Sequence, residues 1–210
     1  MAATKRQPLN RERILEAAID FVDREGLEAL SMRKLGAELG VEAMSLYNHV
    51  QSKGALLDGM VEVLLRDLKV PPESDDWEVR VREAYRRFRQ LAHAHPNVFP
   101  LLIVRPPDTM DGAWLVETFL NTLQTAGFDA KTALQAYRTL TSFTVGYVIS
   151  ELRGFAMEPG NGRLGARGLP SEEFPRLAEL SPFLGDIDRN AEFEGGLDLI
   201  FSGLRRHLSG

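Results

Sequence analysis

The sequence predicts an all-α protein, and three observations support this prediction. Apolar residues recur three or four positions apart along most of the 210 residues, which is the spacing of a helix with one buried face. Residues that cap helices, such as Asn10, Ser31, Ser52 and Asp129, precede many of these runs, and glycine or proline follows them. No stretch of useful length alternates between apolar and polar residues as a half-buried strand does.

The first helix is expected to run from its cap at Asn10 to about Glu25, where Gly26 can end it. One apolar stripe follows the helical period along it and contains Ile14, Leu15, Ala18, Phe21 and Val22. This stripe predicts that one face of the helix is buried against its neighbours.

Residues 31–50, SMRKLGAELGVEAMSLYNHV, predict two short helices joined by a tight turn. Ser31 can cap the first helix, and Gly40 supplies the left-handed backbone that ends it. Each helix has an inward face, formed by Met32, Leu35 and Leu39 in the first helix and by Leu46 and Val50 in the second. The side chains that remain outward are Ala43, Met44, Ser45, Tyr47, Asn48 and His49.

These outward side chains carry small, hydroxyl, amide, imidazole and phenol groups, which can contact base edges and phosphates in a major groove. The segment is therefore a candidate helix-turn-helix motif for binding double-stranded DNA. A helical hairpin packed inside a core is the other interpretation of the same pattern.

The net charge of −5 argues against DNA binding at first, but the distribution of charge favours it. Lys5 and Arg6 lie on an N-terminal arm, Arg33 and Lys34 begin the second helix, and Lys53 begins the fourth. Most acidic residues of this region lie on the first helix, away from that edge. A local basic face together with helix N-termini is sufficient for phosphate binding.

Beyond residue 50 the chain stays helical. Ser52 can cap a fourth helix that begins at Lys53, and the Pro71-Pro72 pair must end it. A fifth helix follows a cap at Asp75 or Asp76, and its five arginines are expected mostly on the solvent-facing side. A short sixth helix is predicted to start at residues 95–96 and to break at residues 105–107, and Gly127 ends a seventh.

The eighth helix is predicted from Asp129 to about Leu152, and the tenth from about Phe193 to Leu208. Between them lie residues 154–170, rich in glycine, and a short ninth helix at 175–180. The eighth and tenth helices carry more apolar and small residues than one buried stripe uses, which is consistent with core packing or with a second copy of the chain.

Three segments carry a resemblance to the tetracycline-repressor (TetR) family of bacterial transcription regulators. They are NRERILEAAIDFVDREGLEALSMRKLGAELGV at 10–41, LYNHV at 46–50 and SKGALLDGM at 52–60. A weaker likeness to the C-terminal type of the tetracycline repressor runs through VRPPD, VET, GF and FTVGYVISE in the remaining two thirds. The resemblance implies a DNA-binding domain at residues 1–52 and a larger helical domain for ligand binding and dimerisation at 53–210.

The resemblance further implies a dimeric, ligand-responsive regulator, a repressor in the first instance, which binds a palindromic operator and pairs through its eighth and tenth helices. A transcriptional activator of the same fold is the alternative. Base or groove-edge contact is expected from Arg33, Ala43, Met44, Ser45 and Asn48. Phosphate contact is expected from Tyr47, His49 and Lys53, with support from Lys34, Lys5 and Arg6.

Helices five to eight hold aromatic and apolar residues that are consistent with a plain core or with a ligand cavity. The resemblance implies that some of them line a pocket for a small apolar or aromatic effector. The candidates are Phe88, Leu91, Phe99, Leu102, Ile103, Trp114, Phe119, Tyr137, Phe143 and Tyr147. Lys69 and about Leu101 stand where the tetracycline repressor has metal-site histidines, so we expect no metal ion, no cofactor and no tetracycline.

Other function classes are less well supported by the sequence. His93 and His95 lie two residues apart, which is wrong for one helix face, and no third ligand with metal-site spacing follows. No nucleophile elbow, P-loop or dinucleotide fingerprint is present. An all-α ligand-binding enzyme and a protein-interaction module remain as alternatives. With no cysteine, no signal-like segment and no apolar run of membrane-spanning length, we expect a cytoplasmic protein without membrane contact.

Overall fold

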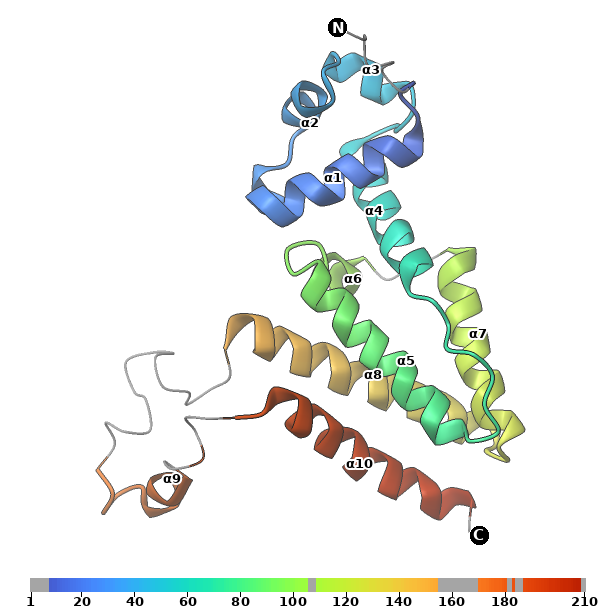
Figure 1. Cartoon of the computed structure of the whole chain (residues 1–210), viewed down its shortest axis with the longest axis vertical. Coiled ribbons are helices and arrows are strands. Elements are labelled where there is room, and N and C mark those ends of the chain that lie inside the picture. The colour runs from blue at the N-terminus through green and yellow to red at the C-terminus, as the bar shows by residue number, and fades with distance from the viewer. Residues whose placement is uncertain (1–7, 106–108, 155–169, 181–182, 184–186, 209–210) are drawn as a thin grey trace, which may run out of the picture. The chain divides into compact units, whose positions relative to one another are not determined.

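The structure is a computed structural model, shown in Figure 1, and it describes residues 8–105, 109–154, 170–180, 183 and 187–208. Every regular element within these ranges is a helix, so the predicted all-α class is confirmed. The chain divides into two units, Met1–Val70 with Gln90–Thr118 and Pro71–Arg89 with Phe119–Gly210. Helices α5 (Trp77–Ala94) and α7 (Met110–Thr125) contribute to both units.

The first unit begins with four helices: α1 (Arg11–Glu25), α2 (Met32–Leu39), α3 (Ala43–Tyr47) and α4 (Lys53–Asp67). The three caps predicted for helices of this unit are confirmed. Asn10, Ser31 and Ser52 accept hydrogen bonds from the backbone N–H groups of Arg13, Lys34 and Ala55 at 2.8, 3.3 and 3.0 Å. A short 3₁₀ helix, η1 (Leu27–Ala29), joins α1 to α2 after Gly26. These local bonds fix where each helix starts.

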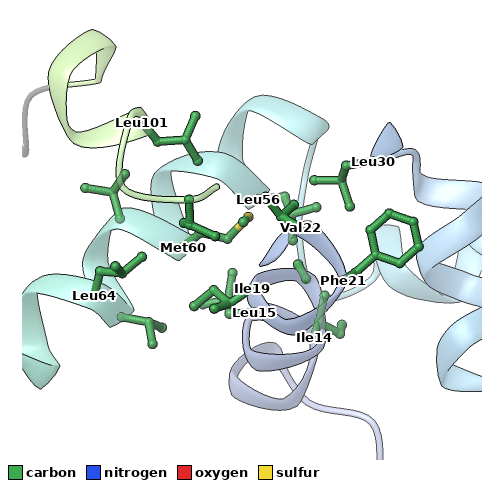
Figure 2. Close-up of a cluster of buried hydrophobic side chains, with 14 of the residues drawn as sticks. Ile14, Leu15, Ile19, Phe21, Val22, Leu30, Leu56, Met60, Leu64 and Leu101 are labelled. Carbon is green, nitrogen blue, oxygen red and sulfur yellow. The ribbon is translucent and has the colours of Figure 1, made fainter. Parts of the chain in front are cut away.

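The core of the first unit lies between α1 and α4 (Figure 2). Leu15 and Ile19 of α1 face Met60 and Leu64 of α4 in this cluster, and all four side chains are buried. The two helices cross closely at Gly59, where an added Cβ would lie 2.6 Å from a Cδ atom of Leu15. This contact packs α4, which starts directly after the helix-turn-helix segment, against α1.

A short helix, α6 (Leu101–Val104), also belongs to the first unit, and Leu101 packs into the same core (Figure 2). It starts later than the predicted residues 95–96, because residues 96–100 form turns instead. Pro100 has no N–H to donate to the carbonyl four residues earlier, so a continuous helix from residue 96 cannot form.

The second unit contains the first part of α5 and the second part of α7, together with α8 (Ala130–Arg153), α9 (Pro175–Leu180) and α10 (Arg189–Leu208). Asp76 is the residue that caps α5, since its Oδ1 accepts from the N–H groups of Glu78 and Val79 at 2.8 and 3.3 Å. α8 and α10 pack together at Gly196, where an added Cβ would lie 2.3 Å from the ring of Phe143. Most of the predicted glycine-rich loop, residues 155–169, lies outside the described residues.

Two arginines of α5 are covered, in contrast to the solvent-facing position predicted for most of this set. The side chains of Arg82 and Arg89 are each only 15% exposed. Arg89 donates from Nε and Nη2 to the two carboxylate oxygens of Glu151 on α8, at 2.8 and 2.6 Å, and from Nη1 to Asn190 at 2.8 Å. Its guanidinium also lies 5.0 Å from the ring centre of Phe193, so this ion pair connects α5, α8 and α10.

Candidate DNA-binding surface and effector site

The turn between α2 and α3 holds the two helices in close contact. Gly40 adopts the left-handed conformation, with φ of 67° and ψ of 36°, and ends α2 as predicted. The chain then turns back so that the Val41 N–H donates to the Gly36 carbonyl at 2.9 Å. A Cβ on Gly36 would lie 2.9 Å from the Val41 oxygen, so only glycine fits there without displacement of the backbone. No role was predicted for Gly36 from the sequence, although a glycine inside a short helix can indicate that another part of the backbone packs closely against it.

The outward face of α3 is exposed while its inward face is sealed. Leu46 and Val50 are buried in the core of the first unit. Met44 and Tyr47 are 73% and 41% exposed. The helix is shorter than predicted and ends at Tyr47, so Asn48 lies in the turn after it, where its side chain is exposed as well. His49 is also exposed, whereas Ala43 and Ser45 are half-buried at the base of the same face. A convex helix with polar and aromatic side chains on its open side can enter a major groove.

The predicted basic residues have three different settings. Arg33 and Lys34 are exposed at the first turn of α2, and neither pairs with a carboxylate in the part of the chain that the structure describes. Lys53 instead donates from Nζ to the Leu30 carbonyl at 2.7 Å, so it holds the start of α4 to the segment before α2. Lys5 and Arg6 lie outside the described residues.

Several acidic residues of the first unit are paired with arginines. Arg66 binds Glu12 at 3.1 Å, Arg11 binds Glu62 at 2.7 Å and Arg24 binds Glu38 at 3.0 Å. These exposed pairs add little stability. Their effect is to reduce the negative potential of α1, α2 and α4, which otherwise opposes the approach of a phosphate backbone.

The ten predicted effector-site residues fall into two groups of five, one in each unit. In the first unit Leu91 and Phe99 are buried and Leu102 is half-buried against the core. Ile103 and Trp114, in contrast, are 47% and 63% exposed. These two side chains therefore lie on the surface of the first unit and not in its core.

In the second unit the aromatic members form a connected set, comprising Phe88, Phe119, Tyr137, Phe143 and Tyr147. The rings of Phe119 and Tyr137 meet edge to face with centroids 5.4 Å apart. Phe143 stacks on Phe193 at 5.6 Å, and Tyr147 donates to the Arg189 carbonyl at 2.9 Å. Burial is the main cause that raises the pKa of Tyr147, to about 12, so its phenol is a neutral hydrogen-bonding group at physiological pH.

Tyr85 and Thr144 of the second unit are also buried, and neither was selected from the sequence. Tyr85 of α5 is buried, and its hydroxyl lies 3.0 Å from Thr141 Oγ1 on α8. Burial raises the pKa of this phenol well above its usual range. Thr144 is also fully buried, and its hydroxyl has no hydrogen-bond partner among the residues that the structure describes. Its position seven residues after Tyr137 was the available signal, because this spacing places two residues on one helix face.

The outer face of α8 and α10 is hollowed and partly apolar. A groove of about 500 Å³ lies between the two helices. It is lined by Thr132, Gln135, Ala136, Thr139, Leu199, Ile200, Gly203, Leu204, Arg206 and His207. Leu199 at its edge is 79% exposed, the largest exposed fraction among the large apolar side chains that the structure describes.

Lys69 and Leu101, the two positions compared above with metal-site histidines, carry side chains that do not usually bind metal ions. Leu101 is buried in an apolar core and Lys69 is exposed after the end of α4. Within the described ranges, no three His, Cys, Asp or Glu side chains are grouped so that they could hold a metal ion. In the same part of the chain, no helix is long and apolar enough to cross a lipid bilayer.

Comparison with known proteins identifies both parts of the chain. Residues 14–60 match the family described as bacterial regulatory proteins, tetR family, and residues 70–208 match the tetracyclin repressor-like C-terminal domain. The class A tetracycline repressor from transposon 1721 of Escherichia coli is 34% identical over 97% of this chain and 92% of its own length.

Two Streptomyces proteins are also similar. The transcriptional repressor DrrR1 of Streptomyces coeruleorubidus is 32% identical over 93% of this chain and 77% of its own length. The structure of ActR from Streptomyces coelicolor in complex with actinorhodin has a TM-score of 0.81 and 31% identity, and the match covers 97% of this chain and all of ActR. The chain belongs to the tetR family of bacterial regulatory proteins, which are ligand-responsive, DNA-binding transcription regulators that act as dimers.

Proposed function

We propose that this protein is a repressor that binds a palindromic operator as a homodimer and leaves it when a small aromatic effector binds. The observation that carries the proposal is an exposed surface formed by Met44 and Tyr47 on α3 and by Asn48 and His49 in the turn directly after it. Leu46 seals the helix from behind. Two such helices related by a two-fold axis read half-sites roughly 34 Å apart. An activator of the same fold would use the same surface, and the position of the operator relative to the promoter separates the two functions.

The contacts on DNA follow from the chemistry of each side chain. Asn48 can pair bidentately with adenine, and Met44 with Ala43 offers apolar contact to a thymine methyl group. Ser45 and Arg33 lie at the edges of the same face and complete the base or groove-edge set. Phosphate contact is assigned to Tyr47, His49, Lys34 and Lys53, with Lys5 and Arg6 reaching from the arm. The boundary between the DNA-binding domain (1–52) and the ligand-binding and dimerisation domain (53–210) is part of the same proposal.

The structure of α6 supports a route from effector to DNA within the first unit. Leu101 is buried against α4, and Arg105 donates to the Asp58 carboxylate and to the Gly54 carbonyl, both on α4. The neighbouring Ile103 and Val104 are 47% and 72% exposed. An effector that contacts this exposed side while the other side holds α4 can shift α4, and with it the adjacent α3.

The effector is proposed to be a small, largely apolar or aromatic molecule. Support comes from the aromatic set of the second unit and from the similar ActR, whose structure contains actinorhodin. The ten candidates named from the sequence remain the proposed contact residues. No catalytic step, metal ion or cofactor is needed by this function, and the proposed location is the cytoplasm.

The proposed dimer forms through α8 and α10. Their outer face contains the groove beside Leu199 and three glycines, Gly146, Gly195 and Gly203. At each of these glycines an added Cβ would have no neighbouring atom within 4 Å in the part of the chain that the structure describes. Small residues on adjacent helices allow a second pair of helices to approach closely.

The experiment that tests the DNA-binding role replaces Tyr47 with Ala. Binding to duplexes from the DNA flanking the reading frame is measured by fluorescence anisotropy, at several salt concentrations. We expect a palindrome bound by the wild-type dimer and an affinity lowered about 3- to 30-fold for all sequences in Tyr47→Ala, because a phosphate contact is lost.

Val79→Ala is the matched control, since Val79 is also exposed (56%) but lies on α5 in the second unit. Circular dichroism must show that both variants stay folded. Unchanged operator affinity in Tyr47→Ala would remove Tyr47 from the interface, and the absence of any specific duplex would contradict the repressor function itself.

A further inference from the structure

The residues that follow α5 hold the end of α1 at a single residue, Asp23. The His95 Nδ1 atom lies 2.6 Å from Asp23 Oδ2, and the Asn97 side chain donates from Nδ2 to the Asp23 backbone carbonyl at 2.9 Å. An ionised carboxylate can only accept hydrogen bonds, so Nδ1 of His95 carries the proton of the first contact. These contacts join segments 72 and 74 residues apart in the sequence, and all three residues belong to the first unit.

Asp23 depends on both contacts for its hydrogen bonding. Because α1 ends at Glu25, the Asp23 carbonyl is one of the four that a helix leaves without an N–H partner of its own. The second carboxylate oxygen, Oδ1, is buried and has no hydrogen-bond partner in the part of the chain that the structure describes. Separation from His95 would therefore cost this largely covered carboxylate the hydrogen bond described for it, which is unfavourable for a charged group.

Residues 95–99 form a turn that fixes the geometry of these contacts. The His95 carbonyl accepts from the N–H groups of Val98 and Phe99 at 3.2 and 2.8 Å. The ring of Pro96 fixes its φ angle, and the side chains of Val98 and Phe99 are fully buried. The side chains on either side of Pro96 are thus positioned before they contact α1, so little conformational entropy is lost when the contacts form.

α1 supports the helices that form the DNA-binding surface. It packs against α2 and α4, and Phe21 and Val22, directly before Asp23, are buried in the core of the first unit. α2 in turn holds α3 through the close approach of the backbone at Gly36. Closely packed interiors transmit a displacement instead of absorbing it. A shift at the end of α1 must therefore change the positions of α2 and α3.

We propose that His95 is a positioning residue for operator binding. Through Asp23 it holds α1, and through α1 it holds α2 and α3, in the orientation that the operator requires. The inference rests on the operator binding proposed above and adds a connection that does not pass through α4. Non-specific DNA is bound mainly through charge and tolerates a small change of orientation, whereas contacts to base edges do not. Loss of the His95 contact therefore lowers the affinity for the operator and not the affinity for non-specific DNA.

The test measures the ratio of operator affinity to non-specific DNA affinity by fluorescence anisotropy, for the wild type, His95→Ala and Asp23→Ala. An unfolded fraction of the protein lowers both affinities alike, so the ratio does not respond to a loss of stability. We expect the ratio to fall about tenfold in each variant, within the usual range of coupling between two sites of one protein. The double variant should fall no further than the single variants, because each change removes the same contact.

Two control variants separate the hydrogen bond from other effects of these substitutions. In His95→Asn the amide places an N–H group near the position of Nδ1, so this variant should keep a ratio close to that of the wild type. Asp20→Ala removes an exposed negative charge from the same helix as Asp23 and should leave the ratio unchanged.

An equal ratio in the wild type and His95→Ala overturns the proposal, and so does a fall that is as large in His95→Asn as in His95→Ala. A wild type that prefers no duplex contradicts the proposed function together with this inference. A preference for the operator that every variant shares contradicts the inference alone.

Discussion

At the scale of single residues, the position of α3 depends on a glycine that presents nothing to DNA. Gly36 lies in α2 where the backbone returns after the turn, and a Cβ there would lie 2.9 Å from the Val41 oxygen and 3.2 Å from the Ala43 nitrogen. Both neighbours are backbone atoms, so they cannot move aside as a flexible side chain can. A methyl group at residue 36 must therefore push the start of α3 away from α2.

We expect Gly36→Ala to destabilise the protein by about 1–3 kcal/mol, the range for overpacked interior sites, and to weaken operator binding. Urea unfolding measures the first effect and anisotropy the second. Gly54→Ala is the control, since among the described residues a Cβ there meets just the Ser52 hydroxyl, at an ordinary 3.5 Å. That change should be neutral or stabilise α4 by about 0.5–1 kcal/mol. A Gly36→Ala protein as stable as wild type would show that the turn can relax.

Residues whose role is local were predictable from the sequence, and residues whose role is tertiary were not. Asn10, Ser31 and Ser52 cap helices by bonding N–H groups three residues ahead, so their identity and position are sufficient. Lys53 bonds the carbonyl of Leu30, 23 residues earlier, which no pattern along the chain indicates.

At the scale of helices, the arginines of α5 also have tertiary contacts that the sequence pattern does not predict. Its arginines have the spacing of a solvent-facing stripe, but acidic residues on α8 and α10 cover part of it. Arg82 binds Glu194 and Asp198, which lie 112 and 116 residues further along the chain. The apolar faces of the helices follow from sequence periodicity, whereas the choice of which polar faces meet requires the tertiary structure.

Glu194 gives this network a measurable dependence on pH. The hydrogen bonds from Arg86 and Arg82 are the main reason that the pKa of Glu194 lies below its ordinary value of 4.5. A lowered folded-state pKa means that the pairing stabilises the protein above pH 4.5 and that this stability is lost as the pH falls through the folded-state pKa.

We therefore expect Glu194→Gln to lower the free energy of unfolding by about 1 kcal/mol at pH 7, the scale of a partly exposed ion pair. The difference from wild type should shrink as the pH is lowered below 4.5. Urea unfolding between pH 3 and 7 measures it, with Glu172→Gln as an exposed control in the second unit. A difference that stays constant across this range would mean that the charge of Glu194 contributes nothing to stability.

At the scale of the whole molecule, the glycines of α8 and α10 fall into two kinds. One is covered by a side chain of the same chain, and the others are open to a second copy. Gly196 is used internally, because the Phe143 ring fills the space above it. At Gly146, Gly195 and Gly203 no atom of the described residues occupies that space. The sequence indicated an excess of small and apolar residues on these helices, but only the structure shows which of them remain open for a partner.

Leu199 is the side chain that a second copy should cover. It projects 79% exposed from α10 beside the groove that includes Gly203, and burial of a leucine stabilises an interface by about 2 kcal/mol. We expect Leu199→Arg to convert the dimer to a monomer at micromolar concentration, because two arginines related by the dyad would be buried without partners. Analytical ultracentrifugation measures the mass, and the helical content should not change.

The same variant tests why the regulator must be a dimer. A monomer holds one α3 and binds one half-site, so the specific affinity of Leu199→Arg for the palindrome should fall at least 100-fold, toward the affinity of wild type for a single half-site. Val79→Arg places the same charge on an equally folded chain at an exposed position of α5 and should remain a dimer with full operator affinity. A Leu199→Arg protein that is still dimeric would move the interface away from this face of α10, and a monomer that still binds the palindrome tightly would separate operator recognition from dimerisation.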